Sequence, residues 1–337
     1  MKVVPTLFAD TATILLLSSS NKDLQMLTKT LSATGCNLKV VMNLAEAEQT
    51  IMAQNIDLLV VDYDQQTQTN QDDHGALDAF LQRFAQLPAS HWVSGRTRIL
   101  LLAGRRNREE MRHIFDLSFA SNIVAKSNEF SPGELITTVG KIIRNDIFGI
   151  DKYLCYGATP TTYEVSSSLQ KDPLLNAMSE YATNIGINKR IISAVAGVAD
   201  ELLMNAIYNA PIYPNGVRPY ARQSRTIPVE LQPNETCFFS FASDGTNFLI
   251  SVHDRFGSLT PEKIRGYLVR CFSMGDDQIE QKQGGAGMGF YFIMENLNKL
   301  IVNISPGRGT EFIGIIDISG TYRDYIERCK SFHIFVG

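Results

Sequence analysis

Short apolar runs alternate with amphipathic stretches along the first 146 residues of the chain. Five runs have the length and composition of buried strands, and the apolar positions of three other stretches repeat with helical spacing. Continuous apolar strands that alternate with helices are typical of a parallel sheet covered on both faces, so we expect an α/β fold here. The predicted strands are 13–19, 37–42, 57–64, 97–104 and 122–127, and the predicted helices are 22–35, 44–55 and 132–146.

The pattern changes in the second half of the chain. Two helical patterns come first, three strand patterns follow, and the sequence SDGTN predicts an antiparallel hairpin between the second and third strands. Two further strand patterns lie beyond a glycine cluster, so we expect an α+β domain with helices packed on a mixed sheet. The predicted helices are 172–185 and 188–209, and the predicted strands are 225–232, 235–243, 247–254 and two within 299–319. The predicted domains are 1–147 and 171–337, with a linker at 148–170.

Composition narrows the class of protein. The 337 residues are 44% hydrophobic and 20% charged, and the formal net charge is −4, which argues against nucleic acid as the main partner. The five cysteines form no C-x-x-C pair, which favours a reducing compartment over a zinc site or a disulfide framework. The apolar run near the N-terminus is too short to span a bilayer and lacks a cleavage site. We therefore expect a cytoplasmic protein with no membrane insertion.

Two polar residues end strands of the predicted parallel sheet. Asp62 closes the third strand and Lys126 closes the fifth, and the carboxyl ends of parallel strands meet at one edge of a sheet. In this arrangement the first half resembles a bacterial response-regulator receiver domain, of the flavodoxin-like fold. The resemblance implies that Asp62 is the phosphoacceptor and that Lys126 contacts the phosphate.

Two parts of the receiver pattern are missing. The stretch SSSN at 18–21 stands where the family has its acidic magnesium-binding pair, and Ala103 and Gly104 stand where it has a hydroxyl residue. Without magnesium, an incoming phosphoryl group meets an uncompensated carboxylate. We therefore favour a degenerate receiver that serves as an interaction or dimerisation module over one phosphorylated at Asp62. A substitute ligand from Asp23 or Asp64 keeps the second interpretation open. The polar stretch 64–75 predicts a loop insertion.

The second half carries polar groups beside a glycine cluster. Glu201, Asn205 and Asn209 follow one another at i, i+4 and i+8 and so share a helix face. Asp254 ends a predicted strand. The stretch QGGAGMG at 283–289 comes directly before an apolar helical run, and glycines before a helix N-terminus allow close approach of a phosphate to backbone N–H groups.

These motifs occur in a specific order. ELLMNA lies on a helix, VHDRFG ends a strand, GGAGMG precedes a helix, and GTEFIGII begins a strand. Over roughly 171–320 this order resembles the GHKL superfamily of ATP-binding domains, which have the Bergerat fold. The resemblance implies ATP and Mg²⁺ as ligands. It implies that Asp254 accepts the adenine amino group, that Gly257 turns the backbone around adenine, and that Thr310 supports the aspartate.

The resemblance also assigns the phosphate end of the site. Asn205 would bind the magnesium that bridges the phosphates, and Glu201 would be the general base. Asn209, on the same helix face, would also be a cofactor-binding residue. The second glycine box, whose amides hold the phosphates, would comprise Gly285, Gly287 and Gly289. The first glycine box departs from the family pattern, because DRFGS places Phe256 and Ser258 where glycines are usual. Phe256 would either stack on adenine or pack in the core.

Several functions fit this combination. No histidine has the setting of a phosphoacceptor on a dimerisation helix, so we discount a histidine kinase. Because Glu201 is present, we favour an anti-sigma-type kinase acting on a partner's Ser or Thr, or a small ATPase. The alternative is a non-catalytic nucleotide-sensing or protein-interaction module of a two-component or partner-switching pathway. In each case the expected setting is bacterial signal transduction with protein partners.

Overall fold

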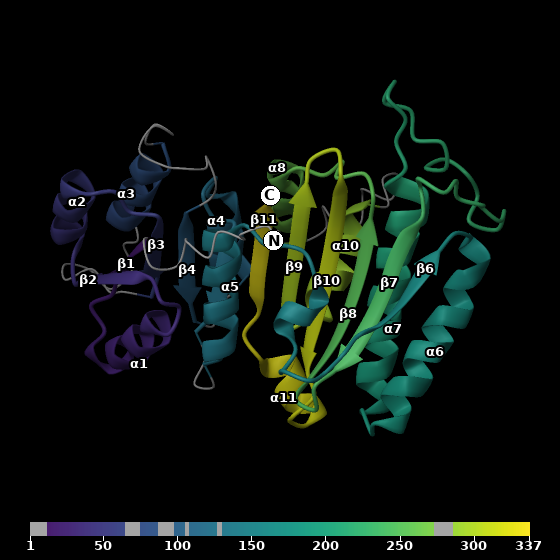
Figure 1. The fold of residues 1–337 in the computed structure, drawn as a ribbon, viewed down its shortest axis with the longest axis horizontal. Coiled ribbons are helices and arrows are strands. Elements are labelled where there is room, and N and C mark those ends of the chain that lie inside the picture. The colour runs from purple at the N-terminus through teal and green to yellow at the C-terminus, as the bar shows by residue number, and fades with distance from the viewer. Residues whose placement is uncertain (1–11, 65–74, 87–97, 105–107, 127–129, 273–285) are drawn as a thin grey trace, which may run out of the picture. The chain divides into compact units, whose positions relative to one another are not determined.

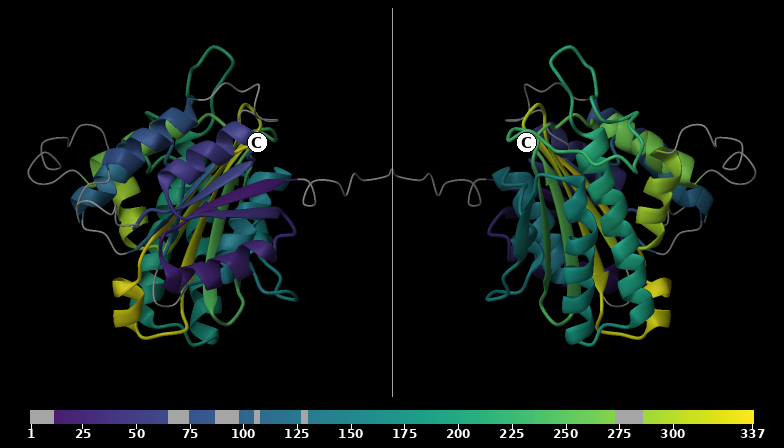
Figure 2. Two further views of the ribbon diagram at one scale, coloured as in Figure 1. Left: turned by 90° about the vertical axis from the view of Figure 1, so that its left-hand side faces the viewer. Right: turned by 90° about the vertical axis from the view of Figure 1, so that its right-hand side faces the viewer.

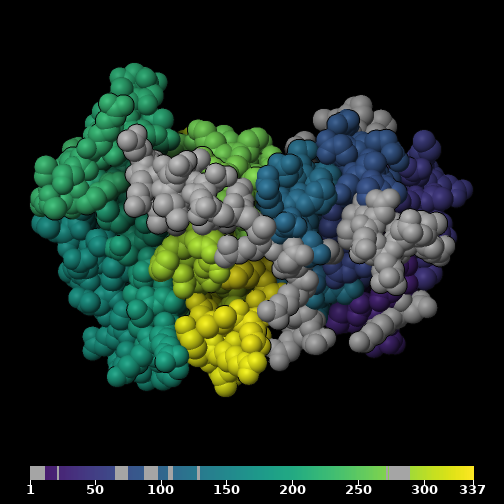
Figure 3. Space-filling view, turned by 180° about the vertical axis from the view of Figure 1, so that it is seen from behind, coloured from purple at the N-terminus to yellow at the C-terminus, as the bar shows by residue number. Residues whose placement is uncertain are grey.

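The computed structural model describes residues 12–64, 75–86, 98–104, 108–126, 130–272 and 286–337. The chain forms two compact units, Met1–Ile147 and Phe148–Gly337. Figure 1, Figure 2 and Figure 3 draw the described residues in colour and the others in grey.

The first unit contains a parallel five-stranded sheet with the order β2-β1-β3-β4-β5 (Figure 1). This is the strand order of the flavodoxin-like doubly wound fold. All five strands were predicted from the apolar pattern, each a few residues longer than the structure has it. The strands are β1 (Thr13–Leu17), β2 (Asn37–Val41), β3 (Leu58–Asp62), β4 (Ile99–Ala103) and β5 (Asn122–Ala125).

In the described part of this unit, five helices accompany these strands. Ser20, Asn43 and Ser131 cap three of them by accepting hydrogen bonds from backbone N–H groups of the first turn. The helices are α1 (Asn21–Ser32), α2 (Leu44–Ala53), α3 (Gly75–Ala85), α4 (Arg108–Asp116) and α5 (Pro132–Arg144). The sequence pattern did not predict α3 and α4. The predicted loop insertion at 64–75 lies mostly outside the described residues.

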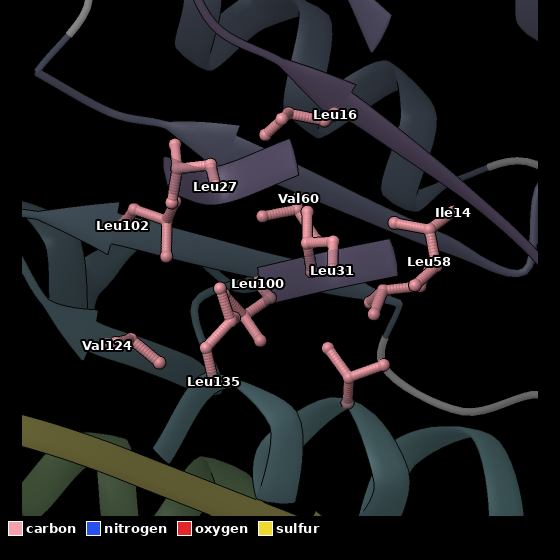
Figure 4. Close-up of a cluster of buried hydrophobic side chains, with 11 residues drawn as sticks. Ile14, Leu16, Leu27, Leu31, Leu58, Val60, Leu100, Leu102, Val124 and Leu135 are labelled. Atoms are coloured by element: carbon pink, nitrogen blue, oxygen red, sulfur yellow. The ribbon is translucent and has the colours of Figure 1, made fainter. Parts of the chain in front are cut away.

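One face of this sheet is closed by α1 and α5. Leu27 and Leu31 of α1, with Leu135 and Val139 of α5, meet the side chains that alternate along β1, β3 and β4 (Figure 4). The intervening strand residues, such as Leu15, are equally buried, so both faces of the sheet are covered. Burial of the strands on both sides explains why they appear in the sequence as unbroken apolar runs.

The second unit contains a mixed six-stranded sheet with the order β11-β9-β10-β8-β7-β6. Its neighbouring strands are antiparallel, except that β11 and β9 are parallel. The hairpin of β7 and β8 and the hairpin of β9 and β10 agree with the predicted strands. The strands are β6 (Thr161–Val165), β7 (Cys237–Ser243), β8 (Asn247–Asp254), β9 (Lys299–Ser305), β10 (Gly309–Asp317) and β11 (Ser331–Val336).

Helices of this unit pack on one face of the sheet (Figures 1 and 2). Tyr181 of α6 contacts the ring of Phe248 in β8, and Phe290 of α10 contacts the ring of Phe312 in β10. In Figure 3 the teal of α6 and α7 and the yellow-green of α10 lie in front of the strands. The helices are α6 (Lys171–Asn184), α7 (Lys189–Met204), α8 (Pro261–Phe272), α10 (Ala286–Glu295) and the short α11 (Tyr322–Glu327).

The predicted helix 188–209 begins as α-helix and ends as π-helix. Asn188 caps α7, and a single π-helical segment, η4 (Asn205–Asn209), follows Met204. The π-helix arises because the N–H of Ala210 donates to the carbonyl of Asn205, five residues back, at 2.9 Å. Among the described residues, Lys189–Asn209 is also the one helix long and apolar enough to span a bilayer. Its apolar stripe, which includes Val198 and Leu202, is buried within the unit.

Two expectations for the second half are wrong. The segment 225–232 is not a strand, because the N–H of Ile227 donates to the carbonyl of Ser224 in a turn and Pro228 has no N–H to give to a sheet. The segment 148–170 is not a simple linker, because it contains the 3-10 helices η2 (Ile150–Tyr153) and η3 (Ser168–Gln170) as well as β6. The sequence analysis also missed α11 and β11.

Candidate functional site

The expected site of the first unit is a closed ion-pair cluster. Asp62, at the end of β3, is 1% exposed, and the Nζ atom of Lys126 donates to both of its carboxylate oxygens, at 2.9 and 2.8 Å. Ser18 Oγ donates to Asp62 Oδ2 at 3.0 Å. A second carboxylate, that of Asp23, lies 2.7 Å from the same Nζ atom. Lys126 therefore pairs with two carboxylates at once.

Lys126 offsets one of the two negative charges of this cluster. Burial alone would lower the pKa of Lys126, but its hydrogen bonds with Asp23 and Asp62 and their charges raise the pKa above its ordinary value. Asp64, the other candidate ligand, accepts a hydrogen bond from the N–H of Gly104 at 2.8 Å. Within the described ranges, no group of three or more His, Cys, Asp or Glu side chains could hold a metal ion.

The second candidate site begins with a buried carboxyl group at the end of β8. Asp254 is 7% exposed, and its Oδ1 atom accepts hydrogen bonds from the N–H groups of Phe256 at 2.8 Å and of Gly257 at 3.4 Å. No cation pairs with this carboxyl group among the residues that the structure describes. Burial raises the pKa of Asp254 to about 6, although the N–H groups of Phe256 and Gly257, and Thr310, oppose the rise.

Thr310 lies directly opposite Asp254 in the register of β10 and β8. Both residues point to the helix-covered face of the sheet, because they lie an even number of positions from Phe312 and Phe248, which contact helix residues. The Thr310 hydroxyl is buried and makes no hydrogen bond of normal geometry in the described part of the chain, although it lies close enough to Asp254 to lower the pKa of that carboxyl group. A buried hydroxyl of this kind indicates a position prepared for a ligand or an ordered water.

Gly257 has a structural reason to be glycine. Its φ angle is +58°, and a Cβ atom at this position would overlap the carbonyl oxygen of Ser305. The chain therefore leaves β8 in a tight turn under the β9–β10 connection. Phe256, in the same turn, is half-buried.

The predicted row of polar side chains on α7 and η4 is present. Asn209 Nδ2 donates to Asn205 Oδ1 at 2.7 Å, and Asn205 Nδ2 donates to Glu201 Oε1 at 3.2 Å. Each side chain thus orients the next. The π-helical turn that carries the two asparagines is an irregularity of the kind found frequently at functional sites.

Glu201 links this row to α10. A Cβ atom on Gly289 would overlap the Glu201 carboxylate, which would have to shift to make room for it. Burial raises the pKa of Glu201 above its ordinary value, while the hydrogen bond from Asn205 opposes the rise. Gly287 lies in the first turn of α10, and Gly285 lies outside the described residues.

One arginine that the sequence analysis did not select joins the two halves of this site. Arg218 donates through Nη1 to the carbonyl of Asn209 and through Nη2 to the hydroxyl of Ser258 at 3.3 Å. It therefore holds the end of η4 next to the turn that follows Asp254. The sequence feature that could have indicated Arg218 is the run 211–229, which contains three arginines and no acidic residue.

Comparisons with known proteins add limited information. No protein-family model matches the chain, and no curated protein matches it significantly. Among solved structures, a protein described as a response regulator from Chloroflexus aurantiacus J-10-fl is 22% identical, with a TM-score of 0.32, and the match covers 40% of this chain and 98% of that chain. The signal receiver domain of an HD domain-containing protein from Pseudomonas fluorescens Pf-5 is 19% identical, with a TM-score of 0.34, covering 43% and 94%.

A third similar structure is the SiaB-SiaC complex from Pseudomonas aeruginosa. A chain of that complex is 13% identical, with a TM-score of 0.32, and the match covers 54% of this chain and 97% of that chain. All three identities are below 25% and all three TM-scores are below 0.5. For this reason the function is inferred below from the geometry of the chain itself.

The first prediction concerns the Lys126 cluster. Lys126→Met leaves the buried Asp62 carboxylate unpaired, which we expect to destabilise the first unit by about 3–5 kcal/mol. The double variant Lys126→Met, Asp62→Asn should recover more than half of that loss. Urea unfolding of the full chain measures the loss in the single variant and its recovery in the double variant. Hydrogen exchange in β1, β3 and β4 shows whether these changes are in the first unit. The exposed Lys39→Met is the control, and a loss no larger than its own would contradict a neutralising role for Lys126.

The second prediction concerns the pH dependence that Asp254 confers. Because its folded pKa is raised to about 6, its stabilising contribution is present at low pH and is lost as the pH rises through 6. Asp254→Asn keeps an acceptor for the two N–H groups and has no charge to bury. We expect the variant to be more stable than the wild type at pH 8, by about 1–3 kcal/mol, and similar to it near pH 4. Hydrogen exchange in β8 and β10 tests this, and a variant less stable at pH 8 would refute it.

Proposed function

We propose that the second unit is an ATP-binding domain of the GHKL type. The observation that carries the proposal is the Asp254–Thr310 pair, a buried carboxyl group without a cation beside a buried hydroxyl that makes no hydrogen bond of normal geometry. An adenine ring offers a complementary edge, since its amino group donates and its neighbouring ring nitrogen accepts. The order of motifs along the chain, from ELLMNA to GTEFIGII, supports the same assignment.

The phosphates of the nucleotide would extend toward the row of Glu201, Asn205 and Asn209. The N-terminal turn of α10, with Gly287 and Gly289, would supply backbone N–H groups to them. Both ends of this path are tied together in the structure, because Arg218 contacts both Asn209 and Ser258. This contact supports the proposal that the adenine and the phosphates occupy one site.

The donor set fits a magnesium ion that arrives with the phosphates. Mg²⁺ prefers oxygen ligands and is often held by one or two protein groups together with substrate phosphates and water. The amide oxygen of Asn205 keeps a lone pair in addition to the one that Asn209 occupies, and the Glu201 carboxylate lies beside it. The ion would neutralise charge on the phosphates.

Glu201 is the residue suited to act as the general base. Its carboxyl pKa is raised by burial, which makes it a stronger proton acceptor, and Asn205 fixes its orientation. In the proposed reaction, Glu201 accepts the proton of an attacking hydroxyl group while the bond from that oxygen to the terminal phosphorus forms. The bond between this phosphorus and the bridging oxygen breaks, and ADP leaves. The hydroxyl would belong to a Ser or Thr of a protein partner, or to water.

The first unit would then connect this activity to a signalling pathway in the bacterial cytoplasm. Its flavodoxin-like strand order and the position of Asp62 support a receiver-like module. Because Lys126 and Ser18 occupy the carboxylate of Asp62, we propose that the module binds protein partners without being phosphorylated. The same closed cluster favours the second candidate function, a non-catalytic module that senses nucleotide and switches partners.

The third prediction tests adenine recognition. Mg-ATP should bind the full-length protein with a dissociation constant between micromolar and millimolar, and Asp254→Asn should abolish the binding. Isothermal titration calorimetry measures this, with the exposed Asp172→Asn as the matched control. Because Asp254→Asn is expected to be the more stable protein at neutral pH, a loss of binding would not be explained by unfolding. Equal heats from the wild type and Asp254→Asn would reject the assignment.

The fourth prediction tests the base. Glu201→Gln keeps the size of the side chain next to Gly289 but cannot accept a proton, so ATP turnover should fall about 10²- to 10⁴-fold while ATP binding remains. Turnover is measured as ADP release, and Glu180→Gln, at an exposed position of α6, serves as the control. Full turnover in Glu201→Gln would exclude this residue as the base. Absence of turnover in a wild-type protein that binds ATP would favour the nucleotide-sensing module.

A further inference from the structure

Arg225 is held in a defined position on the surface of the second unit. It lies in the turn formed by Ser224 and Ile227, where the Ser224 and Thr226 hydroxyl groups are hydrogen-bonded at 2.8 Å. Its guanidinium carbon lies 4.0 Å from the centre of the Tyr208 ring. Such a stacked arrangement is favourable, and it leaves the edge of the guanidinium open to form hydrogen bonds.

The donors of Arg225 are not used within the protein. Its guanidinium makes no ion pair or hydrogen bond with any residue in the described ranges. Two other arginines of this unit differ, since Arg218 donates to backbone carbonyls and Arg255 donates to Thr236 and pairs with Glu164. An exposed but fixed guanidinium with free N–H groups is suited to bind an anion.

The neighbours of Arg225 indicate which anion. Tyr208, on which it stacks, is a residue of η4 and lies in the chain between Asn205 and Asn209. The charge of Arg225 is also near enough to the Glu201 carboxyl group to oppose the burial-driven rise of its pKa. In the proposed reaction Glu201 contacts the nucleophile that attacks the terminal phosphate. A cation beside both Glu201 and η4 is therefore near the terminal phosphate rather than the adenine.

We propose that Arg225 binds the terminal phosphate of the nucleotide and makes the site prefer a triphosphate to a diphosphate. The inference rests on the proposed function and adds to it a residue and a basis for selectivity. The contact would be bidentate and charge-assisted, because the stacked guanidinium presents two parallel N–H groups to phosphate oxygens. Loss of the terminal phosphate on conversion to ADP removes the contact and would favour release of the product.

The test compares two nucleotides with three proteins. Dissociation constants for Mg-ATP and Mg-ADP are measured calorimetrically with the full-length wild type, Arg225→Gln and Arg222→Gln. Arg222 is an exposed arginine of the same segment and serves as the matched control. We expect Arg225→Gln to weaken ATP binding about 10-fold or more and to leave ADP binding unchanged, and we expect Arg222→Gln to change neither. Retained ADP binding shows that Arg225→Gln is folded.

The other outcomes separate this inference from the function it rests on. If the wild type binds neither nucleotide, the ATP-binding assignment fails and the role of Arg225 fails with it. If both nucleotides bind but Arg225→Gln leaves the ratio of their affinities unchanged, only the role of Arg225 is rejected. An equal loss in Arg222→Gln would also reject it, because the effect would then be one of general positive charge.

Discussion

The second unit is organised around a buried carboxyl group that no cation in the described structure neutralises. Asp254 ends β8 on the helix-covered face of the sheet, where the backbone N–H groups of Phe256 and Gly257 donate to it and Thr310 lies close enough to lower its pKa. Gly257 permits the turn that aims both N–H groups at one oxygen, and the register of β10 places Thr310 beside the carboxyl group. A polar group buried in this way lowers stability unless a ligand satisfies it. We infer that the unit retains it for binding.

Each unit contains a buried aspartate at the end of a strand, and the surroundings of the two aspartates differ. Asp62 and Asp254 both end strands and both are buried, but Asp62 is neutralised by Lys126, which also pairs with Asp23. In the first unit a lysine of the same unit pairs with the carboxylate of Asp62, and both of its oxygens accept hydrogen bonds. In the second unit the hydrogen-bonding capacity of the site is incomplete. This difference supports a division of roles in which the first unit contributes surfaces and the second contributes a ligand site.

Much of this arrangement could be predicted from local patterns in the sequence. Apolar runs predicted all five strands of the first unit, and the SDGTN turn predicted the β7–β8 hairpin, which carries Asp254. Helical spacing alone aligned Glu201, Asn205 and Asn209, because residues at i and i+4 are neighbours even where α-helix passes into π-helix. Local patterns failed where pairing depends on distant partners. The sequence of β6 contains polar residues, and it forms a strand because β7 offers an edge to pair with.

The residues around the site were less predictable than the site itself. Segment 225–232 has strand-like composition, yet Pro228 and the turn at Ser224 limit its pairing to one bridge between Glu230 and Ser167, and this turn is what fixes Arg225. No periodicity in the sequence indicates that Arg225 stacks on Tyr208, seventeen residues earlier in the chain, because that contact depends on how a loop folds back on η4. The sequence shows only that the run 211–229 contains arginines and no acidic residue. Such a charge pattern does not specify where an individual arginine lies in the fold.

The most direct test of the central claim uses a nucleotide that differs from ATP only at the edge Asp254 is proposed to recognise. Inosine triphosphate has a carbonyl oxygen in place of the adenine amino group, so it would present an acceptor to a carboxylate and leave the buried acceptor unsatisfied. Competition between the magnesium complexes of the two nucleotides for the full-length protein measures the difference. The account predicts that ATP binds at least about 10²-fold more tightly than inosine triphosphate. Equal affinity for the two would contradict it.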